Sequence, residues 1–196
     1  MIKIGLTGGI GTGKSVVSEI LNEMGAEIIS GDLLGHEAYL PDTDGFNKVV
    51  AQFGQDIVDS NGHIDRKKLG PIVFSNPENM AKLNLIMHPI IYQMIKENMA
   101  KFTSNIDIIV VEAAVLIEAN WQDLFDQIWV VSADEEVVIQ RLATRNNFTK
   151  EEALKRIQSQ MPQSERIKYA DVVVDNSNTL EDLKGNIKKI WHSKLY

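Results

Sequence analysis

The sequence contains no cysteine, only 5 prolines and 7% aromatic residues among its 196 positions. The lack of cysteine excludes a disulfide framework, a thiolate metal site and cysteine-based redox chemistry. Positive charge is also in the minority, because 20 Lys and Arg face 27 Asp and Glu and the net charge is -7. A surface of that sign does not favour nucleic acid, so we expect no nucleic-acid partner.

Long hydrophobic runs are absent as well. The apolar run at the N-terminus, MIKIGL, stops at glycines and is too short for a signal peptide core or a membrane span. We therefore expect no membrane contact and a cytoplasmic location, and no feature indicates an obligate protein partner. Hydrophobic residues at 44% and charged residues at 24% are typical of one globular domain of this length.

Short apolar runs and helical periodicities alternate along the chain. Runs typical of buried strands lie at 2–6, 26–30, 107–112, 126–132 and 171–175, and helical spacing at 15–24, 134–145, 150–160 and 179–191. Residues 41–103 contain no convincing strand, and their helical stretch 80–99 is interrupted at His88-Pro89. The pattern predicts an α/β fold with a five-stranded parallel sheet, helices on both faces and a helical insertion.

A glycine-rich loop joins the first predicted strand to the first predicted helix. Gly8, Gly13, Lys14 and Ser15 match the pattern G-x-x-x-x-G-K-[ST]. Such a loop wraps backbone N–H groups around phosphate, its lysine reaches the β and γ phosphates, and its hydroxyl binds Mg²⁺. A plain glycine turn explains one or two of these residues but not the whole pattern, so we expect a nucleoside triphosphate and Mg²⁺ here.

The loop does not say which nucleotide enzyme this is. A GTPase needs a guanine-reading N-K-x-D, but Asn47-Lys48 is followed by Val49-Val50. Asp32, directly after the second strand, is a candidate for orienting an acceptor hydroxyl and taking its proton, as a small-molecule kinase requires. The alternative is a helix N-cap, for which Asp is common.

Further candidates each have an ordinary structural alternative. Arg141 and Arg145 are four apart on a predicted helix and could clamp polyphosphate, or they could form a solvated face. Glu112, at the end of the third strand, could lie near the magnesium or meet solvent. His88 by itself is better interpreted as a packed histidine at an X-Pro corner.

Together these segments closely resemble the dephospho-coenzyme A kinase family of P-loop kinases over nearly the whole chain. The resemblance is carried by IGLTGGIGTGKS (4–15), IISGDLLGHEA (28–38), FGQDIVDSNGHIDRKKLGPIVFSNP (53–77), the Leu83–Pro89 segment, VVEAAVLIEANW, RLATRNNFTKEEALKRIQSQM and YADVVVDN. Two departures occur: Gly35-His36 stands where many members have Arg, and Ala114-Val115-Leu116 replaces a frequent Pro-Leu-Leu.

The resemblance implies the fold and the reaction. The fold would be a single three-layer P-loop kinase domain with a core at about 1–35, 105–140 and 168–196, a helical CoA-binding region at about 36–104 and a lid at about 141–167. The reaction would be phosphorylation of the ribose 3′-hydroxyl of dephospho-CoA by ATP, the final step of CoA synthesis. A nucleoside monophosphate kinase and a non-catalytic nucleotide-binding module remain as alternatives.

The resemblance also implies roles for single residues. Asp32 would be the catalytic base, with Lys14 and Arg141 stabilising charge. His88, with Asp32 and Glu112, would serve the acceptor side, and Ser15 the metal. The residues expected to bind ATP are Gly9, Ile10, Gly11, Thr12, Gly13, Lys14, Ser15, Val16, the lid residue Arg145, and Asn176 near the adenine.

Overall fold

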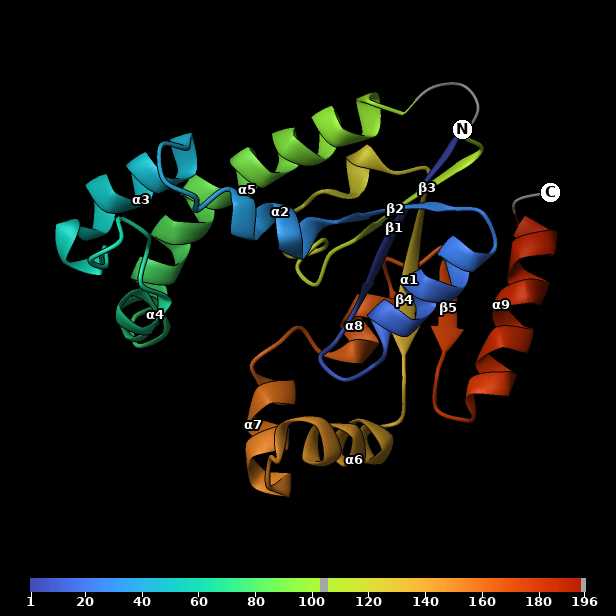
Figure 1. The fold of residues 1–196 in the computed structure, drawn as a ribbon. Helices are drawn as coiled ribbons and strands as arrows, with labels where there is room; N and C mark the ends of the chain where they lie inside the picture. Colours follow the sequence, from blue (N-terminus) through green and yellow to red (C-terminus); the bar gives the residue numbers. More distant parts are fainter. Residues whose placement is uncertain (103–105, 195–196) are drawn as a thin grey trace. The chain divides into compact units, whose positions relative to one another are not determined.

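The computed structural model describes residues 1–102 and 106–194. The chain divides into two compact units. Unit 1 comprises Met1–Ile29 and Phe102–Tyr196, and unit 2 comprises Ser30–Lys101. Figure 1 labels the elements of both units along the sequence.

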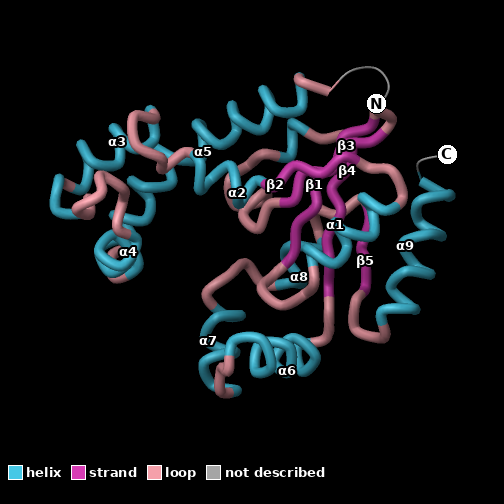
Figure 2. The backbone as a smooth tube through the Cα atoms, viewed as in Figure 1, coloured by secondary structure: helices cyan, strands magenta, loops and turns pink. Residues whose placement is uncertain are grey.

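Unit 1 is built on a parallel sheet. Its strands are β1 (Ile2–Gly8), β2 (Glu27–Ser30), β3 (Ile108–Glu112), β4 (Gln127–Ser132) and β5 (Val172–Asp175), in the order β2-β3-β1-β4-β5 (Figure 2). β1 pairs in parallel with both β3 and β4, so that Leu6 lies opposite Glu112 on one side and Trp129 on the other. The predicted five-stranded parallel sheet is confirmed, and the carboxyl ends of its strands share one edge.

One face of the sheet is covered by α1 (Lys14–Glu23) and α9 (Leu180–Lys194), which pack against each other. Side chains alternate between the faces of a strand, so every second residue contributes to the same core. The strand residues of this core are Ile4, Leu6, Ile108, Val110, Trp129, Val131, Val172 and Val174. Their helical partners include Val17 and Leu21 of α1 and Leu183 and Ile187 of α9. This packing fixes α1, and with it the end of the glycine loop, to the sheet.

The opposite face carries the intervening residues of the strands. A Cβ at Gly5 of β1 would lie 2.7 Å from both Leu116 and Phe125, so the segment before β4, with η2 (Gln122–Leu124), packs directly on the backbone there. The short helix α8 (Gln163–Ile167) contacts β4 on this side, and its Arg166 donates to the Thr7 hydroxyl at 3.3 Å. Both faces are therefore covered, as the near-continuous apolar strands predict.

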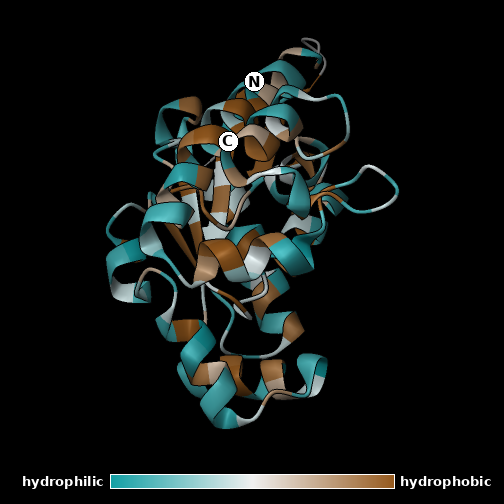
Figure 3. Cartoon of the chain, turned by 90° about the vertical axis from the view of Figure 1, so that its left-hand side faces the viewer, coloured by the Kyte–Doolittle hydropathy of each residue, from teal (hydrophilic) through white to brown (hydrophobic). Residues whose placement is uncertain are grey.

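Two further helices of unit 1, α6 (Glu135–Asn146) and α7 (Lys150–Gln158), share a small core of their own around Leu142 and Ala153. α7 begins with a capping box in which Thr149 and Glu152 satisfy each other's backbone N–H groups. The backbone and hydroxyl hydrogen bonds from Thr149 lower the pKa of the Glu152 carboxyl. In Figure 3 the helices alternate teal and brown segments, which is the pattern of helices with one buried stripe.

Unit 2 is helical. It contains α2 (Gly31–Glu37), α3 (Asp44–Phe53), η1 (Gln55–Ile57), α4 (Arg66–Phe74) and the long α5 (Pro77–Ala100), against which α2, α3 and α4 all pack. Within the described ranges, none of the helices is long and apolar enough to cross a membrane.

The expected interruption of the helix at His88-Pro89 is wrong, because α5 runs through Pro89. A proline inside a helix removes one N–H and frees the carbonyl four residues earlier, which belongs to Leu85. Pro89 is exposed, and Leu85 lies on the same solvent side with 77% of its surface exposed. Water can therefore hydrogen-bond the freed carbonyl, and the helix continues.

Candidate active site

The loop between β1 and α1 has the conformation that an anion-binding loop requires. Gly11 and Gly13 take positive φ values of 74° and 96°, which favour glycine. The Lys14 ammonium donates to the carbonyl of Gly8 at 3.0 Å, so it folds back over the start of the loop. The loop then runs into the N-terminus of α1, whose dipole favours negative charge.

Two side chains from distant parts of unit 1 donate hydrogen bonds to carbonyl groups of the loop. The Asn176 amide donates to the carbonyl of Thr12 at 2.8 Å, although the two residues lie 164 positions apart in the sequence. The Arg141 guanidinium donates to the carbonyls of Gly11 and Thr12 at 3.4 Å each, and to the Asn176 carbonyl at 2.8 Å. These hydrogen bonds hold the carbonyls of Gly11 and Thr12 in place.

The motif glycine Gly13 is required by this arrangement as well as by its φ. A Cβ at Gly13 would clash with the Asn176 amide nitrogen. Asn176 itself is 5% exposed, so it has little room to give way. Any residue larger than glycine at position 13 would therefore displace the Asn176 side chain.

Side-chain oxygen atoms of α1 and β3 lie close together where the loop ends. The Ser15 hydroxyl donates to one carboxylate oxygen of Glu112 at 3.2 Å, and the Ser18 hydroxyl donates to the other at 2.8 Å. Hydroxyl and carboxylate oxygens are ligands that Mg²⁺ accepts, and Mg²⁺ commonly uses one or two protein oxygens together with substrate phosphates. No group of three or more His, Cys, Asp or Glu that could hold a metal occurs in 1–102 or 106–194. The residues present thus fit a phosphate-bound Mg²⁺ rather than a metal caged by protein.

The two predicted clamp arginines do not lie in equivalent places. Arg141 contacts the loop, whereas Arg145 is exposed in the last turn of α6 and donates to the neighbouring Asn146 side chain at 3.1 Å. Arg156 lies over the Phe148 ring at 5.9 Å. The structure therefore brings Arg141, Asn176, Lys14 and the Ser15–Glu112 pair to the loop, and it places Arg145 at the surface.

Asp32 and His88 belong to unit 2. Asp32 is exposed in the first turn of α2, and the N-cap of that helix is Ser30, whose hydroxyl accepts from the N–H of Leu33 at 3.2 Å. The N-cap of α2 is therefore Ser30, and the alternative that Asp32 is the helix N-cap is wrong. His88 is half-buried on α5.

His36 of α2 contacts an arginine from α4. The Arg66 guanidinium lies 3.0 Å from the His36 Nε2 atom and 5.8 Å from the centroid of the Tyr39 ring. Since a guanidinium can only donate, the Nε2 atom of His36 is the acceptor in this contact.

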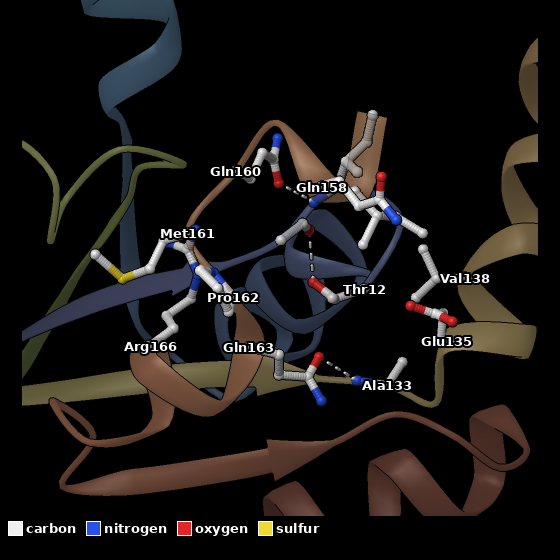
Figure 4. A pocket seen from close by; sticks show the side chains of 13 residues that line it. Thr12, Ala133, Glu135, Val138, Gln158, Gln160, Met161, Pro162, Gln163 and Arg166 are labelled. Atoms are coloured by element: carbon white, nitrogen blue, oxygen red, sulfur yellow. Dashed lines mark hydrogen bonds between the residues drawn. The ribbon is translucent and has the colours of Figure 1, made fainter. Parts of the chain in front are cut away.

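A cavity of about 370 Å³ lies beside the loop (Figure 4). Its lining comes from the loop, from the β4–α6 junction and from the segment 157–166, and includes Ile10, Thr12, Val138, Gln160, Met161 and Arg166. Gln160 accepts a hydrogen bond from the Ile10 N–H at 2.8 Å and so joins the end of the α7 segment to the loop. The volume is within the range of small-molecule sites, about 300–1,000 Å³.

Arg166, in the wall of this cavity, forms an ion pair with Glu118, whose side chain is 31% exposed. Arg166 is 2% exposed and donates to Glu118 at 2.8 Å, with further contacts to the Thr7 hydroxyl and the Ala114 carbonyl at 3.3 Å. Its Nε atom has no hydrogen-bond partner among the described residues. Sequence reasoning missed this pair because its members lie 48 positions apart and neither belongs to a motif of known chemistry.

Replacing Glu118 with Gln is expected to lower the free energy of unfolding by about 2 kcal/mol, because the buried Arg166 charge loses its counter-charge, while water at the exposed part of the Glu118 side chain limits the loss. Urea unfolding followed by circular dichroism measures the difference. The matched control is Glu165→Gln on α8, the helix that carries Arg166, because the ion pair of Glu165 with Lys168 is well exposed. That control is expected to change stability by less than about 1 kcal/mol; an equal loss in both variants would contradict the role of burial.

The chain is similar to known proteins over nearly its whole length. Residues 2–182 match the family model described as dephospho-CoA kinase. The dephospho-CoA kinase of Carboxydothermus hydrogenoformans is 45% identical over 95% of this chain and 91% of its own length. The structure of dephospho-CoA kinase from Campylobacter jejuni superposes with a TM-score of 0.73 at 28% identity, covering 98% of this chain and 96% of that one.

A more distant likeness supports the fold only. The shikimate kinase of Acinetobacter baumannii has a TM-score of 0.57 at 16% identity, covering 100% of this chain and 96% of its own. The match over residues 2–182 includes the loop, Asp32, His88, Glu112, Arg141 and Asn176. The chain therefore belongs to the dephospho-CoA kinase family.

Proposed function

We propose that this chain, a dephospho-CoA kinase of the final step of CoA biosynthesis, transfers the γ-phosphoryl group of ATP to the ribose 3′-hydroxyl of dephospho-CoA with Asp32 as the base. The proposal is supported by the geometry of the loop and by the family match. The loop geometry selects a nucleotide as the phosphoryl donor, and the family match, which carries the proposal, selects the acceptor.

On the donor side, the loop 9–16 binds the phosphates through its N–H groups, and the Lys14 ammonium leaves the Gly8 carbonyl for the β and γ phosphate oxygens. Ser15 and Glu112 are the residues that would hold Mg²⁺, which neutralises charge on the phosphates when it is bound. Arg141 and Asn176 fix the conformation of the loop through hydrogen bonds to its carbonyls, so the loop has to rearrange less during the reaction.

On the acceptor side, Asp32 accepts a hydrogen bond from the 3′-hydroxyl and aligns its oxygen with the γ-phosphorus. The bond from that oxygen to phosphorus forms while the bond to the departing ADP oxygen breaks. The hydroxyl proton passes to the Asp32 carboxylate and then to solvent. His88 contributes to binding the acceptor.

The lid, about 141–167, is proposed to close over the phosphates and exclude water, which limits wasteful hydrolysis of ATP. Arg141 and Arg145 are its candidate cations. Arg145 is exposed and its guanidinium donates to the Asn146 side chain, so water can replace that bond and the side chain can be redirected at small cost.

A coupled assay of ADP release tests the acceptor. We expect turnover with dephospho-CoA at a rate at least about 100-fold above that with AMP, CMP or UMP, because these nucleotides have a ribose 3′-hydroxyl but lack the rest of dephospho-CoA, whose binding energy positions that hydroxyl for attack. Activity with a nucleoside monophosphate and none with dephospho-CoA would contradict the proposal. ATP binding without turnover on any acceptor would instead indicate a nucleotide-binding module.

A further inference from the structure

We propose that Ser18 is a positioning residue for Mg²⁺: it holds the Glu112 carboxylate in the orientation in which Ser15 can ligate the ion. The inference rests on the proposed function in so far as it takes the loop to bind Mg²⁺ with ATP. Ser18 lies outside the phosphate-loop pattern, which ends at Ser15.

The spacing along α1 brings both hydroxyls to one carboxylate. Ser15 and Ser18 are three residues apart, so they lie on the same face of the helix, and that helix packs against β3. Glu112 is the last residue of β3 and reaches this face from the edge of the sheet. Each of its two carboxylate oxygens receives one hydroxyl, Oε1 from Ser15 at 3.2 Å and Oε2 from Ser18 at 2.8 Å.

The two hydrogen bonds differ in strength and exposure. Ser15 is exposed, so water competes for its hydroxyl, and the bond is the longer of the two. Ser18 is 5% exposed and its bond is the shorter, so it is protected from exchange with water. A hydrogen bond to an ionised acceptor is stronger than a neutral one, particularly away from solvent. Ser18 is therefore the anchor of the carboxylate.

The Glu112 carboxylate that Ser18 holds in turn orients the Ser15 hydroxyl. A hydroxyl has one proton to donate and two lone pairs to offer. While Glu112 Oε1 accepts the proton, the lone pairs of Ser15 point elsewhere and are available to a cation. Without Ser18, Glu112 loses the hydrogen bond to its Oε2 atom and keeps three rotatable side-chain bonds, so the carboxylate turns more readily toward water and the direction of the Ser15 proton is less fixed.

We expect the loss of the Ser18 hydroxyl to weaken Mg²⁺ binding and to leave nucleotide binding without Mg²⁺ intact. The Ser18 hydroxyl donates to Glu112 and not to the loop, so nucleotide binding without the ion is expected to persist. Removing a partner that orients a metal ligand typically weakens metal binding about 10- to 100-fold. Since Ser15 still bonds Glu112 weakly, we expect a change at the low end of that range.

The test measures the affinity of a fluorescent ATP analogue as a function of Mg²⁺ concentration, with no acceptor present. In Ser18→Ala, the Mg²⁺ concentration at half-effect should rise about 10-fold, while affinity for the analogue in EDTA stays within about 2-fold of the wild type. Ser18→Thr keeps the hydroxyl and should restore most of the Mg²⁺ response. Ser193→Ala, which removes an exposed hydroxyl bonded to the Ile190 carbonyl on α9, should leave both quantities unchanged.

The outcomes separate this inference from the proposed function. An unchanged Mg²⁺ response in Ser18→Ala overturns the inference, and so does an equal loss of affinity with and without Mg²⁺, which indicates general damage to the loop. If Ser18→Ala does not fold, Ser18→Cys, with a near-equal volume and a weak S–H donor, takes its place and should show the same shift. Failure of the wild type to phosphorylate dephospho-CoA, with the Mg²⁺ shift intact, overturns the proposed acceptor and supports the role of Ser18.

Discussion

Replacing Asp32 with Asn is expected to lower turnover with dephospho-CoA at least about 100-fold, the usual scale for a positioned base. The amide keeps the shape of the side chain and its hydrogen-bonding capacity, but it cannot take a proton from the acceptor hydroxyl. ATP affinity should stay near the wild-type value, because the phosphates are bound by the loop between β1 and α1. Steady-state kinetics with both substrates varied, together with direct ATP binding, measure the two effects.

The matched control for Asp32 is Asp44, which also lies in the first turn of a helix of unit 2 and pairs with Lys48 at 2.7 Å. Asp44→Asn should leave turnover unchanged if the effect at Asp32 is chemical rather than electrostatic support of a helix end. Since Ser30 caps α2, Asp32→Asn does not remove a cap. Wild-type turnover in Asp32→Asn would remove this residue from the mechanism.

Lys14→Ala is expected to weaken ATP binding and to lower kcat/KM with ATP by about 100- to 1,000-fold, the range found when one preorganised donor to a charged transition state is removed. The ammonium interacts with phosphate oxygens both in the bound substrate and during transfer, so KM and kcat should both change. Binding of an ATP analogue and initial rates over a range of ATP concentrations separate the two contributions.

Lys188→Ala on α9 removes one exposed lysine from the same unit and controls for the change in net charge. We expect its kinetics to match the wild type. If Lys14→Ala also retained wild-type kcat/KM, the assignment of residues 8–15 as the phosphate-binding loop would fail.

Much of unit 1 could be predicted from the sequence because its signals are local. Buried parallel strands give continuous apolar runs, and β3 and β4 were found within one residue of their ends as Ile108–Glu112 and Gln127–Ser132. The glycine pattern marks a loop whose backbone conformation is unusual, with positive φ at Gly11 and Gly13. In both cases the residues themselves determine the structure.

What the sequence could not show depends on contacts between distant residues. Equal spacing suggested that Arg141 and Arg145 would act together, yet Asn176 and the loop carbonyls engage Arg141 while Arg145 lies at the surface. Ser18 was missed although it lies on the same face of α1 as Ser15, because its significance depends on Glu112, 94 positions later.

The position of the new phosphate tests the central claim most directly. Dephospho-CoA, ATP and Mg²⁺ are incubated with the protein, and the product is separated and examined by phosphorus NMR and mass spectrometry. We predict one product that carries a phosphomonoester on the ribose 3′-oxygen, formed in equal amount to ADP. Release of ADP with inorganic phosphate, or a phosphate attached at any other atom, would contradict the account.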